Sequence, residues 1–227
     1  FGGRTLAVVT AGGEGGKRFE SLLKPCGFPV QFVPIRNEIR TNLTITDRQG
    51  LTIKLNERGP SIDAAELENL QAAVQNNLEG AAWLMLCGSL PPDVPPDFYA
   101  GLVAKARSAG VKVLLDTDGE ALVLGLEASP TVVAPNQQEA ERLLNKALIM
   151  RGHYLEAAAR IKAMGAESVV LSLGSRGAVG AIEDRLIEVL PPRIDAVCPI
   201  GAGDALAAAF TWAMDRGDEF VEAMRWG

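Results

Sequence analysis

The alternation of two kinds of apolar segment constrains the fold of this chain more than any other feature of its sequence. Short, continuously apolar runs rich in β-branched residues are separated by longer segments whose apolar residues follow a helical period. Such runs are typical of strands buried on both faces of a sheet, and intervening helices favour parallel pairing. We therefore predict an α/β fold with a mainly parallel central sheet flanked by helices. The expected strands are 5–10, 83–88, 111–117, 131–136 and 168–174, and the expected helices are 63–78, 96–110, 137–144 and 154–165.

One stretch departs from this pattern. Residues 30–56 alternate apolar and polar side chains with a period of two and contain a "DRQG" turn. This predicts antiparallel β structure that stands apart from the main sheet as part of a small β lid. Residues 178–192 are expected to form a second hairpin. The remainder, residues 1–29 and 57–227, is expected to form one α/β domain.

Composition and charge argue against several classes of partner. The net charge is −6, the isoelectric point is about 5.0 and no basic run occurs, so a nucleic-acid partner held by phosphate contacts is not expected. No apolar stretch has the length needed to span a membrane, so no membrane partner is expected. Cys26, Cys87 and Cys198 fit neither a disulfide framework nor a zinc site, which favours a cytoplasmic location.

Polar segments follow the predicted strands. The segments "GSLPP", "DTDGE", "PNQQE" and "LGSRG" each come directly after a strand, and "GAGD" opens a further helical segment near the end of the chain. In open parallel sheets, ligands bind beyond the carboxyl ends of the strands. The sequence therefore predicts one binding site along this edge of the sheet.

The "GAGD" segment has a functional and a structural interpretation. Gly201 and Gly203 let a ligand approach the backbone closely, and the N–H groups of Ala202, Gly203 and Asp204 would open a helix whose dipole favours negative charge. This predicts an anion hole, beside which Asp204 could take a proton from a substrate hydroxyl during phosphoryl transfer. The alternative is an ordinary helix N-terminus with Asp204 as a favourable first-turn acid.

Three residues could serve a metal ion at the same edge. Asn136 and Glu139 form N-x-x-E at a strand-to-helix junction, which puts both side chains on one side of the first helical turn. Their alternative interpretation is a capping box. Asp116 ends a strand and could coordinate a hydrated magnesium ion through water, or could be a turn residue.

Other candidates concern phosphate binding. Arg40, with Asn42 two residues later, could clamp a phosphate or could lie on a solvated strand face. Ser89 could bind the same phosphate or could form a turn. The segment "AGGEGGKR" (11–18) does not match a P-loop, because Ala11 and Arg18 replace the required glycine and hydroxyl residue, and we expect a glycine-rich turn there.

The motifs "RTN", "GSLPP" with "PPDFY", "LDTDGEAL", N-x-x-E, "SLGSRGA" and "GAGD", in this order, resemble the PfkB branch of the ribokinase-like carbohydrate kinases. The likeness covers essentially the whole chain and is greatest to 1-phosphofructokinase and tagatose-6-phosphate kinase. It implies a ribokinase-like three-layer fold with a small β lid, ATP and Mg²⁺ as cofactors, and a homodimer formed through the lid. It also implies that an N-terminal segment and the last helices of the family are absent, so we expect an incomplete nucleotide- and substrate-binding domain.

The resemblance implies a role for each candidate residue. Asp204 would be the catalytic base. The other candidates fall into four sets: an anion hole (Gly201, Ala202, Gly203), a magnesium side (Asp116, Asn136, Glu139), a nucleotide side (Ser172, Gly174, Gly177) and a sugar-phosphate side (Arg40, Asn42, Ser89). Cys198 and Pro199 stand where the family more often has polar residues, and Cys198 is expected to be an inert thiol rather than a redox-sensitive one.

The function expected from these observations is ATP-dependent phosphorylation of a sugar phosphate, with fructose 1-phosphate converted to fructose 1,6-bisphosphate. The same residues suit the phosphorylation of tagatose 6-phosphate or fructose 6-phosphate. Two further alternatives are a kinase for an unphosphorylated sugar or a nucleoside, and a catalytically inactive sensor of sugar phosphates or nucleotides.

Overall fold

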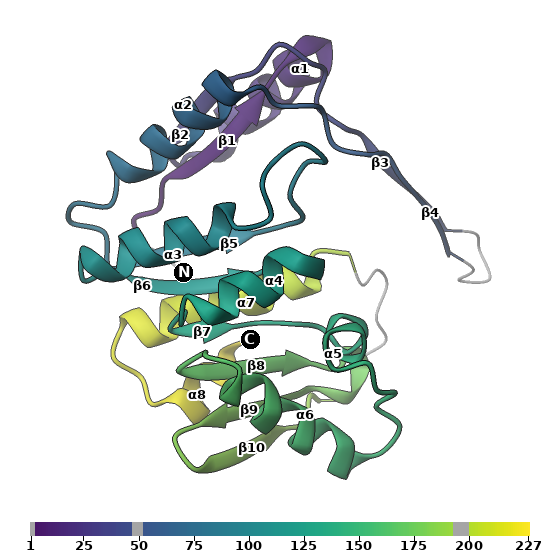
Figure 1. Cartoon of the computed structure of the whole chain (residues 1–227). Helices are drawn as coiled ribbons and strands as arrows, with labels where there is room; N and C mark the ends of the chain where they lie inside the picture. The colour runs from purple at the N-terminus through teal and green to yellow at the C-terminus, as the bar shows by residue number, and fades with distance from the viewer. Residues whose placement is uncertain (1–2, 47–51, 193–199) are drawn as a thin grey trace. The chain divides into compact units, whose positions relative to one another are not determined.

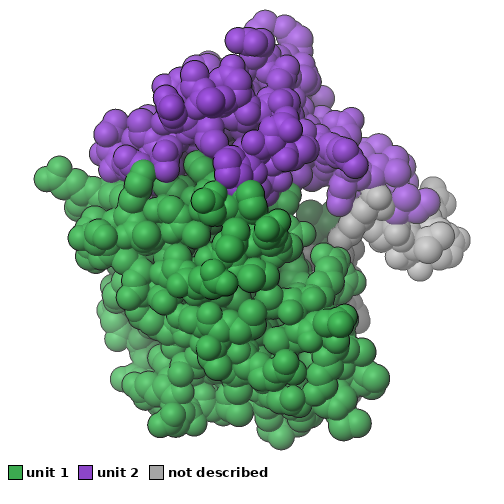
Figure 2. All heavy atoms as spheres, in the orientation of Figure 1, with its two compact units in different colours: residues 1, 78–89, 96–227 green, residues 2–77, 90–95 purple. Residues whose placement is uncertain are grey.

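The structure is a computed structural model that describes residues 3–46, 52–192 and 200–227. The chain forms two compact units, coloured separately in Figure 2. Among the described residues, unit 1 comprises 78–89, 96–192 and 200–227, and unit 2 comprises 3–46, 52–77 and 90–95.

Unit 1 is built on a six-stranded sheet with the strand order β10-β9-β8-β7-β6-β5 (Figure 1). The strands from β5 to β8 pair in parallel, and β9 pairs antiparallel with both β8 and β10. The expected strands of this region and the expected hairpin are therefore all present, although the strand predicted at 131–136 has only two residues. The bounds are β5 Trp83–Cys87, β6 Lys112–Asp116, β7 Val132–Val133, β8 Ser168–Ser172, β9 Ala178–Ile182 and β10 Arg185–Val189.

Helices cover both faces of this sheet. Figure 1 shows α3, α4 and α6 in front of the strands and α7 and α8 behind them. On the face towards α7 and α8, Leu114, Val132 and Val170 pack against Phe210 and Phe220. Buried residues that alternate with these along the strands serve the other face. The helices are α3 Phe98–Ser108, α4 Gly119–Glu127, α5 Gln137–Leu144, α6 Arg151–Ala163, α7 Ala202–Asp215 and α8 Phe220–Trp226, with a 3₁₀ turn, η2, at Gly174–Arg176.

Unit 2 contains two small sheets and two α-helices. β1 (Ala7–Ala11) pairs in parallel with β2 (Val30–Pro34), and α1 (Gly13–Leu23) connects them, followed by a 3₁₀ turn, η1, at Lys24–Cys26. The helix α2 spans Ala64–Gln75 and begins with a capping box between Asp63 and Glu66. The antiparallel pairing expected in 30–56 is found between β3 (Asn42–Thr46) and β4 (Thr52–Asn56).

Two expectations for unit 2 are wrong. Val30–Pro34 does not join the antiparallel hairpin, because a helix precedes it and returns the chain to run parallel to β1. The expected glycine-rich turn at 11–18 is largely helical, since α1 begins at Gly13 despite the low helix propensity of glycine. No helix within the described ranges combines the length and the apolar character needed to cross a membrane.

Candidate active site

The carboxyl edge of the parallel strands brings the candidate residues of unit 1 together. Cys87 and Asp116 are register partners at the ends of β5 and β6, and the Gly88 N–H donates to the Asp116 carbonyl oxygen over 2.8 Å. Beyond β7, Asn136 forms an isolated parallel bridge with Ser172 at the end of β8. The four strands therefore deliver their polar ends to one edge, as expected for a parallel sheet.

The electrostatics of Asp116 show which carboxylates converge there. The pKa of Asp116 is raised to about 6, mainly by burial and in smaller part by the negative charges of Glu139 and Asp204. Cys87 keeps part of its surface exposed, but protein atoms around its thiol raise its pKa to about 12, with contributions from Asp116 and Asp204. The acid on α7 and the acid on α5 therefore both act on the carboxyl group that ends β6.

The first turn of α7 offers open backbone amides. Gly201 is the N-cap residue with φ of 79°, a left-handed conformation that favours glycine, and no described side chain caps this turn. The N–H groups of Ala202, Gly203 and Asp204 have no acceptor within the helix, by the geometry of any helix N-terminus. A Cβ atom at Gly203 would meet nothing within 4 Å, so packing does not require glycine there. Residues 201–204 are exposed in the structure.

Asn136 and Glu139 form the capping box of α5. The Asn136 side chain accepts from the Glu139 N–H over 3.0 Å, and the Glu139 carboxylate accepts from the Asn136 N–H over 2.8 Å. The structural interpretation of N-x-x-E is therefore correct. Burial raises the pKa of Glu139, while its hydrogen bonds to Asn136 oppose that rise. The same pair thus fixes the first turn of α5 and holds a partly buried carboxylate at the edge.

The turn after β5 is held by two side chains that sequence analysis did not single out. The Thr117 hydroxyl donates to the Gly88 carbonyl oxygen over 2.9 Å, and the Tyr99 hydroxyl donates to the same oxygen over 3.1 Å. Both residues are buried. They fix the backbone directly before Ser89. Both lie within quoted segments, but only the strand register shows that they meet.

The turn after β8 is closed by its own backbone. The Leu173 N–H donates to the Gly177 carbonyl oxygen over 2.8 Å, and the Gly177 N–H donates to the Gly174 carbonyl oxygen over 3.0 Å. Gly174 and Gly177 have φ of 61° and 96°, and a Cβ atom at Gly177 would lie 2.0 Å from the Val189 carbonyl oxygen. Ser172 precedes this turn as the last residue of β8.

Arg176 is a further residue that sequence analysis did not single out. It donates from Nη1 to the Tyr154 hydroxyl over 2.5 Å and from Nη2 to the Gln137 side chain, and its guanidinium lies 5.1 Å from the centre of the Tyr154 ring. Gln137 in turn donates to Glu141 over 2.9 Å. Arg176 therefore ties the turn after β8 to the first residue of α5 and to α6.

Comparison with known proteins identifies the family. A model of the pfkB family of carbohydrate kinases matches residues 1–227. The chain belongs to this family. It is 36% identical over 188 residues to 1-phosphofructokinase of Rhodobacter capsulatus, covering 82% of the chain and 60% of that relative. It is 32% identical over 230 residues to ATP-dependent 6-phosphofructokinase isozyme 2 of Escherichia coli (strain K12), covering 100% of the chain and 74% of that relative.

A solved structure of the tetrameric inhibited form of phosphofructokinase-2 from Escherichia coli matches this pfkB chain with a TM-score of 0.89 at 31% identity. The match covers 99% of the chain and 74% of the solved one. The ribokinase-like α/β fold predicted from the sequence is therefore confirmed. The chain spans only part of the length of each of these relatives.

Two candidates of this pfkB chain belong to unit 2 and not to unit 1. Asn42 begins β3, and Arg40 lies in the connection between β2 and β3. Cys198 and Pro199 lie outside the described residues.

The acidic groups at the edge suit a hydrated magnesium ion. After burial, the charges of Glu139 and Asp204 contribute to the raised pKa of Asp116, and a bound cation would offset this repulsion between like charges. Within the described ranges, no group of three His, Cys, Asp or Glu side chains is placed to hold a metal ion directly. Mg²⁺ keeps several of its waters and is commonly bound through one or two carboxylates and substrate phosphates. The donor set therefore fits an ion held largely through water.

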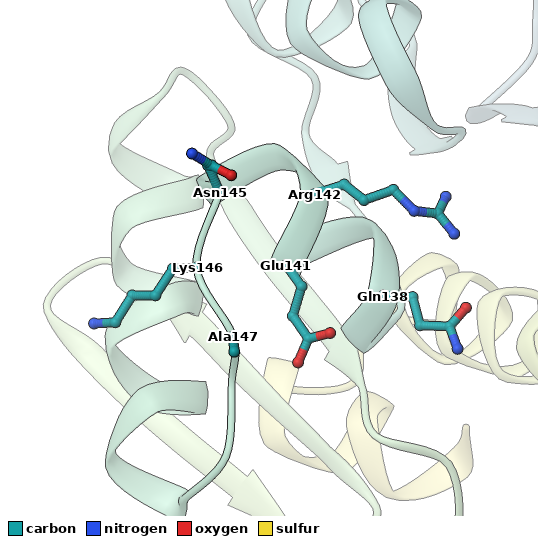
Figure 3. A pocket seen from close by; sticks show the side chains of 6 residues that line it. All are labelled: Gln138, Glu141, Arg142, Asn145, Lys146 and Ala147. Atoms are coloured by element: carbon teal, nitrogen blue, oxygen red, sulfur yellow. The ribbon is translucent and has the colours of Figure 1, made fainter.

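A shallow pocket of about 510 Å³ lies at the other end of α5 (Figure 3). Its charged side chains already have partners, since Arg142 pairs with Asp118 at 3.9 Å and Lys146 with Glu156 at 2.8 Å. It contains none of the predicted site residues. The pocket is lined by Gln138, Glu141, Arg142, Asn145, Lys146 and Ala147.

Proposed function

We propose that the protein transfers a phosphoryl group from ATP to a hydroxyl of a sugar phosphate, with fructose 1-phosphate as the substrate. The observation that carries this proposal is the convergence of Asp204 and Glu139 on Asp116 at the carboxyl edge of the sheet. A base, an anion site and metal-side acids are the groups that in-line phosphoryl transfer requires, since positioning and charge stabilisation supply most of its catalysis.

Each group of the edge has a role in this reaction. Asp204 accepts the proton of the attacking hydroxyl at its carboxylate. The amides of Ala202, Gly203 and Asp204 donate to the oxygens of the transferred group as negative charge develops there. Asp116 and Glu139, with Asn136, hold the magnesium ion through water. When bound, Mg²⁺ supplies charge neutralisation of the nucleotide phosphates.

The substrates are assigned to the remaining candidates. The turn after β8, with Ser172, Gly174 and Gly177, lies under the nucleotide. Arg40, Asn42 and Ser89 hold the phosphate of the sugar. Arginine suits this role because its planar guanidinium can donate two hydrogen bonds to one phosphate. We further propose a cytoplasmic location, in keeping with the free thiols of Cys26 and Cys87.

The choice of sugar is tested by ADP release. Relatives of similar identity are named 1-phosphofructokinase and 6-phosphofructokinase, so both substrates are compared. The assay uses fructose 1-phosphate, fructose 6-phosphate and tagatose 6-phosphate, with fructose and a nucleoside as unphosphorylated controls. We expect the highest kcat/KM with fructose 1-phosphate. A preference for an unphosphorylated acceptor would refute the assignment of Arg40, Asn42 and Ser89 to a substrate phosphate. If no acceptor causes ADP release, the result would favour a catalytically inactive sensor.

The base is tested by Asp204→Asn. Loss of a general base lowers rates by about 10²- to 10⁴-fold, so we expect a fall of this size in kcat. ATP affinity, measured by calorimetric titration, should remain unchanged because the amides of the α7 first turn are still present. The matched control is Asp215→Asn, which makes the same change in the last residue of α7. Ordinary turnover by Asp204→Asn would contradict the assignment.

A further inference from the structure

The connection between β2 and β3 is anchored on the N-terminus of α1. The Glu38 carboxylate accepts hydrogen bonds from the Glu14 N–H over 3.1 Å and from the Gly15 N–H over 2.5 Å. Next to it, the Ile39 N–H donates to the Gly12 carbonyl oxygen over 3.3 Å. All of these contacts lie within unit 2. The segment that carries Arg40 is therefore attached to the first turn of a helix two residues before Arg40.

The glycines of "AGGEGG" leave the space that this carboxylate occupies. A Cβ atom at Gly13 would lie 2.0 Å from Glu38 Oε2, and one at Gly15 would lie 2.6 Å from Glu38 Oε1. A Cβ atom at Gly12 would lie 2.2 Å from the Asn37 carbonyl oxygen. The first amides of a helix lack acceptors within it, and the helix dipole favours an acid there. The amides of the glycine-rich run thus bind the carboxylate of Glu38, a residue of the same chain.

Acids of other elements hold the two ends of the same connection. The Arg36 N–H donates to Glu66 over 2.6 Å, and the Thr41 N–H donates to Glu57 over 2.8 Å. Glu38 differs from these two because the connection itself supplies it. Its side chain therefore holds the middle of the connection on α1, together with the hydrogen bond from the Ile39 N–H to the Gly12 carbonyl oxygen.

We propose that Glu38 is a positioning residue, whose docking on the first turn of α1 fixes the segment carrying Arg40 and so sets the affinity for the phosphate of the sugar substrate. The inference rests on the proposed function, which assigns Arg40 to that phosphate. Glu38 itself touches no reacting atom in this account. It acts by limiting the conformations that Arg40 can adopt before the substrate arrives, which lowers the entropy lost on binding.

Two substitutions break the docking from opposite sides. Glu38→Ala removes the acid, and Gly15→Ala fills its place with a methyl group. Gly15 lies inside α1 without a left-handed backbone, so alanine there also favours the helix. For each variant we expect KM for the sugar phosphate to rise about tenfold, with kcat and KM for ATP unchanged, as for the loss of one charge-assisted hydrogen bond. Glu38→Gln keeps one acceptor and should show a smaller rise.

The control is Glu14→Ala, which removes an acid from the same helix turn. The Glu14 side chain pairs with Lys17 at 2.6 Å on the exposed surface and leaves the docking intact. KM for the sugar phosphate should therefore stay at the wild-type value in this variant. An unchanged KM in both Glu38→Ala and Gly15→Ala, or an equal rise in Glu14→Ala, would overturn the proposal.

Amide hydrogen exchange separates this inference from the proposed function. In Glu38→Ala the amides of Gly15 and Ile39 should exchange faster, while the Thr41 amide, held by Glu57, serves as a reference in the same segment. This result is expected whether or not the wild-type chain releases ADP. If the wild type phosphorylates no sugar phosphate, the proposed function fails. The exchange rates of the Gly15 and Ile39 amides would still show whether Glu38 docks on α1. Unchanged exchange at Gly15 and Ile39 would refute the docking even in an active enzyme.

Discussion

Asp116 illustrates how a residue of the proposed metal side lowers the stability of the free protein. Its folded-state pKa of about 6 lies above the ordinary value of 3.8, so the folded chain keeps a proton that the unfolded chain has already lost. Stability therefore falls as the pH rises from about 4 through 6 and stays lower above that window. The shift reflects burial and the charges of Glu139 and Asp204.

Asp116→Asn should accordingly stabilise the protein in the absence of magnesium and nucleotide. Because Asp116 is only partly buried, we discount the full shift for solvent screening and expect about 1 kcal/mol at pH 7.5, or roughly 2–4 °C in Tm. Thermal unfolding in EDTA, followed by circular dichroism, should show a smaller gain at pH 5 than at pH 7.5. Asp118→Asn, two residues later, should show no such gain. A pH-independent gain, or a loss at pH 7.5, would contradict this account.

The sequence indicated which residue types end the strands, but not how they hold one another. Asp116 and Asn136 could be proposed because acids and amides after parallel strands reach one edge whatever the details of packing. Asp204 could be proposed because it follows two glycines at the start of a helix. Thr117 and Tyr99 could not, because their hydroxyls meet one carbonyl oxygen only after β5 and β6 have paired in register. Contacts between residues far apart in sequence depend on register and rotamer, which local patterns do not contain.

At the scale of elements, the best predictions came from segments where pattern and capping agree. The helix expected at 137–144 has those bounds in the structure, because N-x-x-E closes its first turn. The helix α1 was missed because four glycines oppose a helix locally, and the Glu38 carboxylate that satisfies its first turn comes from 24 residues further on. Without α1, the parallel pairing of β1 with β2 could not be foreseen either.

The link between α5 and the turn after β8 gives a prediction at this scale. Arg176 joins these elements through Gln137 and Tyr154. The Gln137 side chain and the Leu148 N–H, with a smaller contribution from Arg176, hold the pKa of Glu141 below its usual range. Arg176→Lys would lose the planar group that contacts both partners. We expect KM for ATP to rise several-fold, as for the loss of about one net hydrogen bond, with KM for the sugar phosphate unchanged.

Steady-state rates at varied ATP measure this effect. The matched control is Arg142→Lys on α5, whose pairing with Asp118 at 3.9 Å is largely exposed and should contribute little. Equal changes of KM for both substrates in Arg176→Lys would indicate a general loss of structure. They would not indicate a local displacement of α5 and the turn after β8. An unchanged KM for ATP would show that the contacts of Arg176 with Gln137 and Tyr154 do not affect nucleotide binding.

At the scale of the whole molecule, the sequence patterns of the two compact units differ. This difference explains why strand pairing was predicted correctly in unit 1 and only in part in unit 2. The sheet of unit 1 follows from strand-helix alternation over more than a hundred residues. Unit 2 mixes a parallel pair with an antiparallel hairpin, and period-two alternation cannot tell these apart when a helix goes unrecognised. The lid proposed for 30–56 therefore rests on β3 and β4.

The hairpin of β3 and β4 also gives a prediction about assembly. Leu43 pairs with Leu55 and Ile45 with Ile53, which puts four apolar side chains on one face, each about half exposed. An apolar face of this kind on a hairpin favours burial against a second copy of the chain. We expect a homodimer formed through this face.

Light scattering after size exclusion should therefore give twice the chain mass of 24.0 kDa, falling towards the monomer on dilution. Ile45→Glu buries a charge in the proposed interface, so it should shift the protein to the monomer at all concentrations tested. Thr44→Glu adds the same charge on the opposite face of β3 and should leave the dimer in place. A wild-type monomer at high concentration, or equal dissociation of both variants, would show that the apolar face is not the interface.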